Sequence, residues 1–311
     1  MVHSAGARPV RFRAVTARCL AVAAVLGIGA CDLEKTPATP AASGPSPATA
    51  TQPATPQSIG IDPATAVRSA LPAELDAYID AKGGHAGIAV VDRMTGLAVE
   101  SNADTIFQTA SIVKFDILAT RLLQHQKAGT SMTANEKHLA FLMITESDNN
   151  AASALYALDG GASGLAAANK IFGLKVTTPK SAWGRTQTTP ADQVLLLTSV
   201  MDPDGPLTED SRSYILSLMS QVDPEQRWGI TAAAGPEALH VYVKNGWDSI
   251  ALFGGMRGDN SVGRIIESDH DWLIAVMSDY NRTDAVGHLI DGTLSTMAVE
   301  GLRLQHRLAT D

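Results

Sequence analysis

The stretch that decides the fold is Phe107-Gln-Thr-Ala-Ser111-Ile-Val-Lys114-Phe-Asp-Ile-Leu118. Apolar residues recur at helical spacing over residues 111–126, and Gly129 ends the pattern. Because residues three apart on a helix share a face, Ser111 and Lys114 are expected about one turn apart. An amine at that distance can take the hydroxyl proton, which a serine nucleophile requires.

Two further motifs follow in chain order. Ser147-Asp148-Asn149 holds the only Ser-x-Asn of the chain, and Lys244-Asn245-Gly246 is one of three Lys-x-Gly sequences. Of those three, only this one comes directly after an expected strand, residues 240–244. A nucleophile with an amine base, then a second hydroxyl and a second cation, favours acyl transfer through a covalent serine ester.

Composition excludes several classes of protein. The 311 residues are 45% hydrophobic, which is ample for a buried core. The net charge is −8, and without four arginines in the first thirty residues, 20 basic residues face 32 acidic ones. We therefore expect no nucleic-acid partner. Both cysteines precede residue 32, and no Cys/His cluster occurs, so we expect no disulfide framework, no metal and no cofactor.

The N-terminus has the pattern of an export signal. Arginines lie within residues 1–18, and the apolar run 19–30 is too short to span a bilayer. The run ends in Ile28-Gly29-Ala30-Cys31, which resembles a bacterial lipobox. We predict a lipoprotein signal peptide over 1–30 and a lipidated Cys31, which would anchor the exported protein to the outer face of the bacterial cell membrane. The alternative is an ordinary signal peptide with Cys31 incidental.

The remaining chain changes character near residue 66. Residues 31–66 are rich in Pro, Thr, Ala and Ser, and we expect them to form a disordered linker. Residues 67–311 are globular in composition. The expected elements are a helix over 67–82, a hairpin over 86–100, helices through the middle, strands at 240–244, 261–267 and 271–278, and a helix over 283–307. This order predicts an α+β fold, with an antiparallel five-stranded sheet made from both chain ends, flanking helices and a helical subdomain.

Together, the motifs and their contexts resemble the serine β-lactamase and penicillin-binding protein superfamily. The likeness is closest to the class A β-lactamases, whose motif set is Ser-x-x-Lys, Ser-Asp-Asn and Lys-Thr-Gly. It covers roughly residues 70–308. Residues 91–96 resemble the family's first hairpin, 142–149 the helix entering the second motif, and 188–190 the segment after the active-site loop.

The resemblance implies a role for each matching residue. The predicted catalytic residues are Ser111, Lys114 and Ser147, and the predicted substrate-binding residues are Asn149, Lys244, Gly246 and Trp247. Ser111 would be the nucleophile, Lys114 its proton acceptor and Ser147 the proton relay to the leaving nitrogen. Lys244 would receive the substrate carboxylate, and the N–H groups of Ser111 and Trp247 would form the oxyanion hole. The alternatives are an N-cap for Ser111, a solvated Lys114 and simple packing for Trp247.

The chain departs from the class A pattern at the step that removes the acyl group. Class A enzymes use a Glu on the active-site loop, whereas no Glu occurs here between 147 and 208, and Gly184 follows Trp183 where that Glu would stand. Asn245 replaces a Thr or Ser, and Val262 stands where many members carry a carboxylate-binding Arg, although Arg264 is near. These departures predict slow deacylation.

Three functions remain open from the sequence. The first is a β-lactamase-type serine hydrolase that forms an acyl-enzyme with β-lactams. It would confer antibiotic resistance only to the extent that it hydrolyses the antibiotic. The second is a D-Ala-D-Ala peptidase or another amide or ester hydrolase of the cell envelope, which the missing Glu favours. The third is a non-catalytic envelope lipoprotein that binds a ligand or protein. We expect a monomer with a β-lactam or acyl-peptide as its small-molecule partner.

Overall fold

The computed structural model describes residues 63–250 and 254–310. The chain divides into two units, Met1–Gln57 and Ser58–Asp311, and the first unit lies outside the described residues. The predicted signal peptide 1–30, Cys31 and the linker as far as residue 62 also lie outside them. None of the helices in the described ranges is both long and apolar enough to cross a bilayer.

One five-stranded antiparallel sheet organises the described chain. Its strands are β1 (Ala86–Asp92), β2 (Ala98–Ser101), β5 (His240–Ile250), β6 (Met256–Ile266) and β7 (Asp271–Asn281). Their order is β2-β1-β7-β6-β5, so strands from both ends of the sequence meet at β1 and β7. The predicted α+β fold is confirmed. The three late strands are longer than predicted because their hydrogen-bonded registers run into polar ends.

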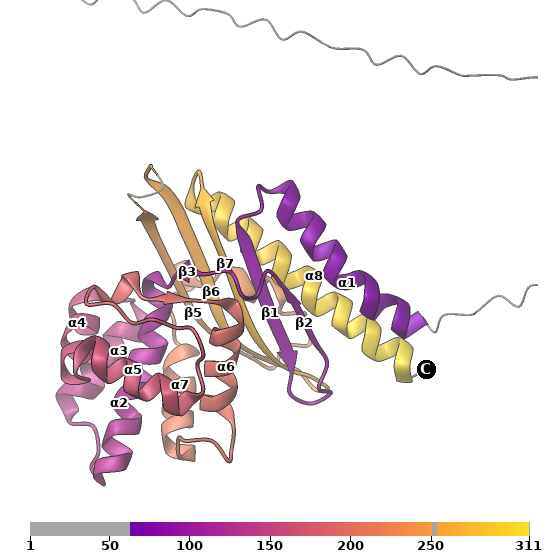
Figure 1. Cartoon of the computed structure of the whole chain (residues 1–311). Helices are drawn as coiled ribbons and strands as arrows, with labels where there is room; N and C mark the ends of the chain where they lie inside the picture. The colour runs from indigo at the N-terminus through magenta and orange to yellow at the C-terminus, as the bar shows by residue number, and fades with distance from the viewer. Residues whose placement is uncertain (1–62, 251–253, 311) are drawn as a thin grey trace, which may run out of the picture. The chain divides into compact units, whose positions relative to one another are not determined.

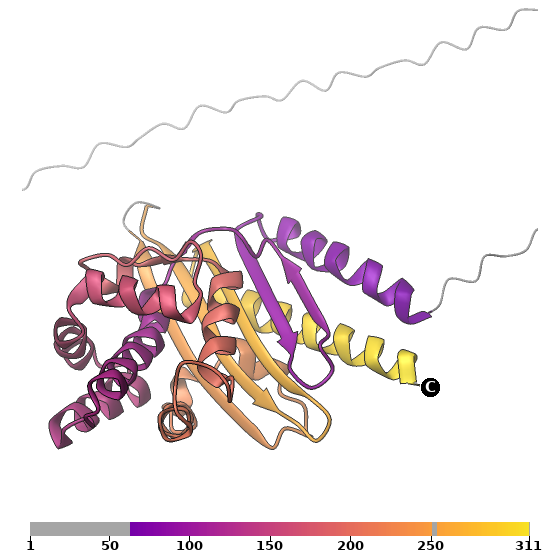
Figure 2. The same cartoon turned by 60° about the horizontal axis from the view of Figure 1, so that its bottom comes forward.

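Helices cover both faces of this sheet. The helices α1 (Pro63–Ala81) and α8 (Asp284–Thr310) pack together against one face, and α6 (Pro190–Met201) packs against the other (Figures 1 and 2). Buried Leu75, Trp272 and Leu294 belong to the core that these layers share. The helix α1 begins at Pro63, four residues before the predicted start, and it takes in the end of the predicted linker.

The remaining long helices form a subdomain beside the β5 edge. They are α2 (Val113–Ala128), α3 (Ala134–Thr145), α4 (Asn149–Leu158), α5 (Gly161–Phe172) and α7 (Glu209–Met219). Short elements link them to the sheet: the two-stranded sheet of β3 (Phe107–Gln108) and β4 (Gln187–Thr188), and the 3₁₀ helices η1 (Ala110–Ile112), η2 (Trp183–Arg185), η3 (Pro224–Gln226) and η4 (Gly229–Ala233). The sequence pattern did not predict the small sheet, because two-residue strands carry no periodicity.

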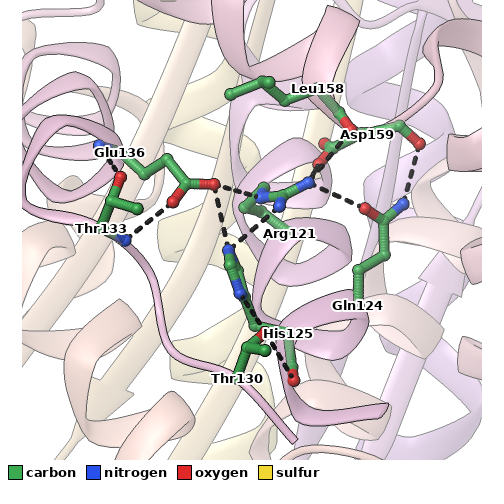
Figure 3. Close-up of polar contacts among 8 residues, drawn as sticks. All are labelled: Arg121, Gln124, His125, Thr130, Thr133, Glu136, Leu158 and Asp159. Atoms are coloured by element: carbon green, nitrogen blue, oxygen red, sulfur yellow. Dashed lines mark hydrogen bonds and ion pairs between the residues drawn. The ribbon is translucent and has the colours of Figure 1, made fainter. Parts of the chain in front are cut away.

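A polar cluster joins three helices of the subdomain (Figure 3). Arg121 of α2 lies 2.8 Å from the Glu136 carboxylate of α3 and 3.7 Å from Asp159, which caps α4. Burial raises the pKa of Glu136, but hydrogen bonds from Thr133 and His125 outweigh it and leave that pKa at about 2. Burial raises the pKa of Asp159 to about 8. At neutral pH the guanidinium is therefore balanced by one ionised carboxylate rather than two.

Candidate active site

Ser111 lies on η1, just before α2, whereas the sequence predicted a helix that begins at Ser111. Asn260 of β6 donates its side-chain N–H groups to the carbonyls of Gln108 and Thr109, and so fixes the chain that leads to the serine. Ala110 has a φ of +45°, which is rare for a residue with a Cβ. This kink presents Ser111 half-buried at the edge of the sheet, and its side chain caps neither η1 nor α2. The N-cap alternative is therefore wrong.

Lys114 is fully buried and points toward the second motif. Its Nζ donates to the Ser147 carbonyl at 2.6 Å, the Ser147 Oγ at 3.1 Å and the Asn149 Oδ1 at 2.8 Å. Burial lowers its pKa to about 8, although the charge of Asp148 partly offsets this. The alternative of a solvated Lys114 is therefore wrong. No hydrogen bond in residues 63–250 joins Lys114 to the Ser111 hydroxyl, and all three ammonium protons have acceptors elsewhere.

A second buried amine, that of Lys244 on β5, reaches the Ser147 hydroxyl. Lys244 Nζ lies 3.1 Å from Ser147 Oγ and 2.9 Å from the Asn245 carbonyl. Complete burial, together with the charge of Lys114, lowers the pKa of Lys244 well below its ordinary value. Ser147 therefore lies between two amines, and its own φ of +58° turns the chain sharply between α3 and α4.

The third motif packs directly against the serine. A Cβ added to Gly246 would lie 2.5 Å from the Ser111 backbone nitrogen and 2.6 Å from that of Ile112, so only glycine fits. Trp247 is half-buried, and its ring meets Trp228 edge to face at 6.1 Å. The Asn245 side chain turns inward and donates to the carbonyls of Gln226 and Trp228.

The short segment before β4, which includes η2, contributes Trp183 and Gly184 to the site. The Trp183 ring lies 5.0 Å from Lys114 Nζ, within cation–π range, and its indole N–H donates to Ser153 Oγ. A Cβ on Gly184 would lie 4.0 Å from the Cα and carbonyl oxygen of Ala110. Gly184, which the sequence resemblance aligned with the class A Glu, therefore faces the chain next to Ser111.

Two side chains near the motifs serve structural contacts. Asp148 caps α4 by accepting from the Ala151 N–H at 2.6 Å, as expected of a structural residue. Arg264 holds Asp271 in a two-pronged ion pair of 2.6 and 2.8 Å, so its guanidinium is engaged within the sheet. Val262, opposite Lys244 in the register, is fully buried.

The predicted residues thus come from five places in the fold: η1, α2, the α3–α4 turn, the start of α4 and β5. The sequence did not single out Asn260, Ser153 or Asp248, which hold this arrangement from β6, α4 and β5. These are ordinary polar residues within regular elements, and only their contacts across the fold distinguish them.

Comparison with known proteins shows the family of the chain. The chain matches the Beta-lactamase enzyme family over residues 120–301, more than half its length, and belongs to that family. The match begins after the Ser-x-x-Lys motif. A protein of Mycobacterium tuberculosis named "Putative lipoprotein LppW" is 29% identical over 178 residues, which are 54% of this chain and 55% of that protein. A Mycobacterium bovis protein of the same name matches equally. The chain thus spans about half the length of these curated relatives.

Solved structures share the fold. The PBP-A variant with a leucine-to-glutamate substitution, seen as an acyl-enzyme complex with penicillin G, aligns with a TM-score of 0.66 and 20% identity, covering 76% of this chain and 97% of that one. The TLA-1 extended-spectrum β-lactamase aligns with a TM-score of 0.67 and 17% identity over 75% and 98%. A β-lactamase from Chitinophaga pinensis gives 0.65 and 16% over 75% and 99%. At these identities the likeness shows the fold.

Proposed function

We propose that the protein is a serine hydrolase of class A β-lactamase type that forms a covalent acyl-enzyme on Ser111 and releases it slowly. The observation that carries the proposal is the pair of buried amines, Lys114 and Lys244, each 3.1 Å from Ser147 Oγ. Keeping two ammonium groups out of water is costly, so this arrangement is more typical of chemistry than of packing.

In the proposed acylation, Ser111 Oγ attacks the carbonyl carbon of the donor as neutral Lys114 takes its proton. The negative charge on the carbonyl oxygen would be stabilised by the backbone N–H groups of Ser111 and Trp247. The acyl C–N bond then breaks, and the leaving nitrogen takes a proton through Ser147 while Lys114 resupplies it. The products are a Ser111 ester and an amine, so atoms and charges balance; in a β-lactam the amine stays joined to the acyl part through the opened ring, whereas in a peptide it leaves.

The second half of the cycle has no obvious base. A water that attacks the ester needs its proton removed, and a positioned base contributes about 10² to 10⁴ in rate. Lys114 is the proposed acylation base, and Gly184 provides no side chain at the loop position. Glu146, another candidate base, caps the end of α3, is exposed and makes no side-chain hydrogen bond within residues 63–250.

A mass-spectrometric experiment tests the proposal. Wild-type protein incubated with benzylpenicillin should gain the mass of one intact penicillin within minutes and keep it for hours. Ser111→Ala should gain nothing, whereas Ser213→Ala, which removes an exposed hydroxyl from α7, should behave as the wild type. Rapid loss of the adduct together with fast nitrocefin turnover would refute slow deacylation. No adduct on wild-type protein would leave the non-catalytic binding protein as the better hypothesis.

A peptidase of the cell envelope is the second candidate, and Gly184 is the observation that favours it. A long-lived ester suits transfer to an acceptor other than water. Release of D-Ala from a D-Ala-D-Ala peptide, faster than nitrocefin hydrolysis, would favour this candidate over the first.

We also propose lipidation at Cys31 and export to the outer face of the membrane. The lipobox-like sequence and the name of the mycobacterial relatives support this. In bacteria fed a labelled fatty acid, the wild type should carry the label in the membrane fraction, and Cys31→Ala should lose it.

A further inference from the structure

The candidate active site has two chemically different ends along β5. Alternate residues of a strand share a face, so Lys244, Gly246 and Asp248 point the same way. Their contacts are consistent with a shared face. Lys244 contacts Ser147, Gly246 packs against Ser111, and Asp248 pairs with Arg185 of η2. At about 3.3 Å per residue, Lys244 and Asp248 lie about 13 Å apart, with Ser111 between them.

The proposed mechanism determines which part of the acyl donor lies at each end of the site. Ser147, which would protonate the leaving nitrogen, is hydrogen-bonded to Lys244. The leaving group therefore lies at the Lys244 end. The acyl part of the donor, held by the ester to Ser111, then extends toward Asp248 and Arg185.

Arg185 offers spare hydrogen-bond donors at this acyl end. Its Nη1 donates to Gln108 Oε1 at 2.8 Å, and its Nη2 lies 3.4 Å from Asp248 Oδ2. A guanidinium has five N–H donors, so most of them remain for a ligand. Both side chains of the ion pair are partly exposed, 41% for Arg185 and 46% for Asp248, so water and ligands can reach them. Arg264 also pairs with an aspartate, Asp271, but its side chain is only 15% exposed.

We propose that Arg185 and Asp248 select acyl donors by the charge on the acyl part. Arg185 binds donors whose acyl part carries a carboxylate, and Asp248 competes with them for the same guanidinium. An ammonium on the acyl part meets the reverse arrangement, because Asp248 attracts it and Arg185 repels it. The inference rests on the proposed acylation of Ser111. Since the pair is exposed, we expect effects of two- to fivefold rather than orders of magnitude.

Three penicillins that differ in one substituent of the acyl side chain test this. Benzylpenicillin is uncharged there, carbenicillin adds a carboxylate, and ampicillin adds an ammonium. The measurement is the second-order rate of Ser111 adduct formation for each, at low salt, expressed relative to benzylpenicillin. Asp248→Asn should raise the carbenicillin ratio two- to fivefold and lower the ampicillin ratio. Arg185→Gln should do the opposite, and the double variant should return toward the wild type.

The outcomes separate this inference from the function on which it rests. Ratios that shift in opposite directions in the two variants, and shrink in 0.5 M salt, support it, because salt screens exposed charges. Variants that slow all three penicillins equally would mean that the pair only ties the loop to β5, and would overturn the inference alone. If no penicillin forms an adduct on the wild type, the proposed function fails, and the inference fails with it.

Discussion

If Ser111 forms the proposed acyl-enzyme and releases it slowly, replacing Gly184 with glutamate should speed that release and give a β-lactamase that turns over. A Cβ at this position would lie 4.0 Å from the Cα and carbonyl oxygen of Ala110, in ordinary contact, and the φ of Gly184 lies outside the left-handed region. The residue can therefore carry a side chain without backbone strain. A glutamate carboxylate would extend two carbon atoms beyond this Cβ, beside the residue that precedes Ser111, and we expect it to take a proton from a water that attacks the ester.

The expected gain follows from the worth of a positioned general base, about 10² to 10⁴ in the deacylation rate. Protein acylated with benzylpenicillin is freed of excess antibiotic, and the loss of the adduct is followed by mass. Gly184→Gln is the matched control, with the same size and no basic oxygen. If the Glu and Gln variants lose their adducts at rates within threefold of each other, the missing carboxylate does not limit deacylation.

Three other perturbations test separate parts of the structure. Because burial lowers the pKa of Lys114 to about 8, the rate of Ser111 acylation should rise about tenfold from pH 6 to pH 7 and level off above pH 8; a flat profile would exclude Lys114 as the base. Gly246→Ala should lower the free energy of unfolding by about 1–3 kcal/mol and slow acylation at least tenfold, because its Cβ would meet the Ser111 nitrogen at 2.5 Å, whereas Gly184→Ala should leave stability nearly unchanged. Burial raises the pKa of Asp116 from 3.8 to about 7, so the folded state holds an extra proton and this group should lower the free energy of unfolding as pH rises from 4 to 7, by up to roughly 1.4 kcal/mol per unit. Other buried carboxyl groups such as Asp159 add a slope of the same sign, so in urea unfolding Asp116→Asn should reduce the slope by about that amount without abolishing it, and an unchanged slope would contradict the assignment.

The sheet and most helices could be predicted because their signals are local. The hairpin strand Ala86–Asp92 has the predicted bounds, since its apolar run ends at a turn sequence. The late strands β5 and β7 extend past their apolar centres into polar residues such as Asp248 and Asn281. Nothing in a polar stretch reveals that it continues a ladder, because the partner strand supplies the hydrogen bonds.

The grouping of the candidate site residues could be predicted only through the family resemblance. Spacing alone placed Lys114 beside Ser111, yet its hydrogen bonds go to Ser147 and Asn149, more than thirty residues away. The kink at Ala110 moves the serine out of α2 onto η1, and no propensity rule assigns a positive φ to alanine. The Arg185–Asp248 pair likewise depends on η2 meeting β5, which only the folded chain determines.

The packing of α1 beside α8 sets α1 at the edge of the sheet remote from the candidate site. This helix contacts β2 at one edge of the sheet, whereas Ser111 lies against β5 at the other, four inter-strand spacings or about 19 Å across. An affinity tag joined directly ahead of Pro63 would therefore lie on the side of the sheet remote from Ser111. Protein immobilised by that end on a bead or sensor chip should accept small molecules and bulky peptides as freely as protein in solution.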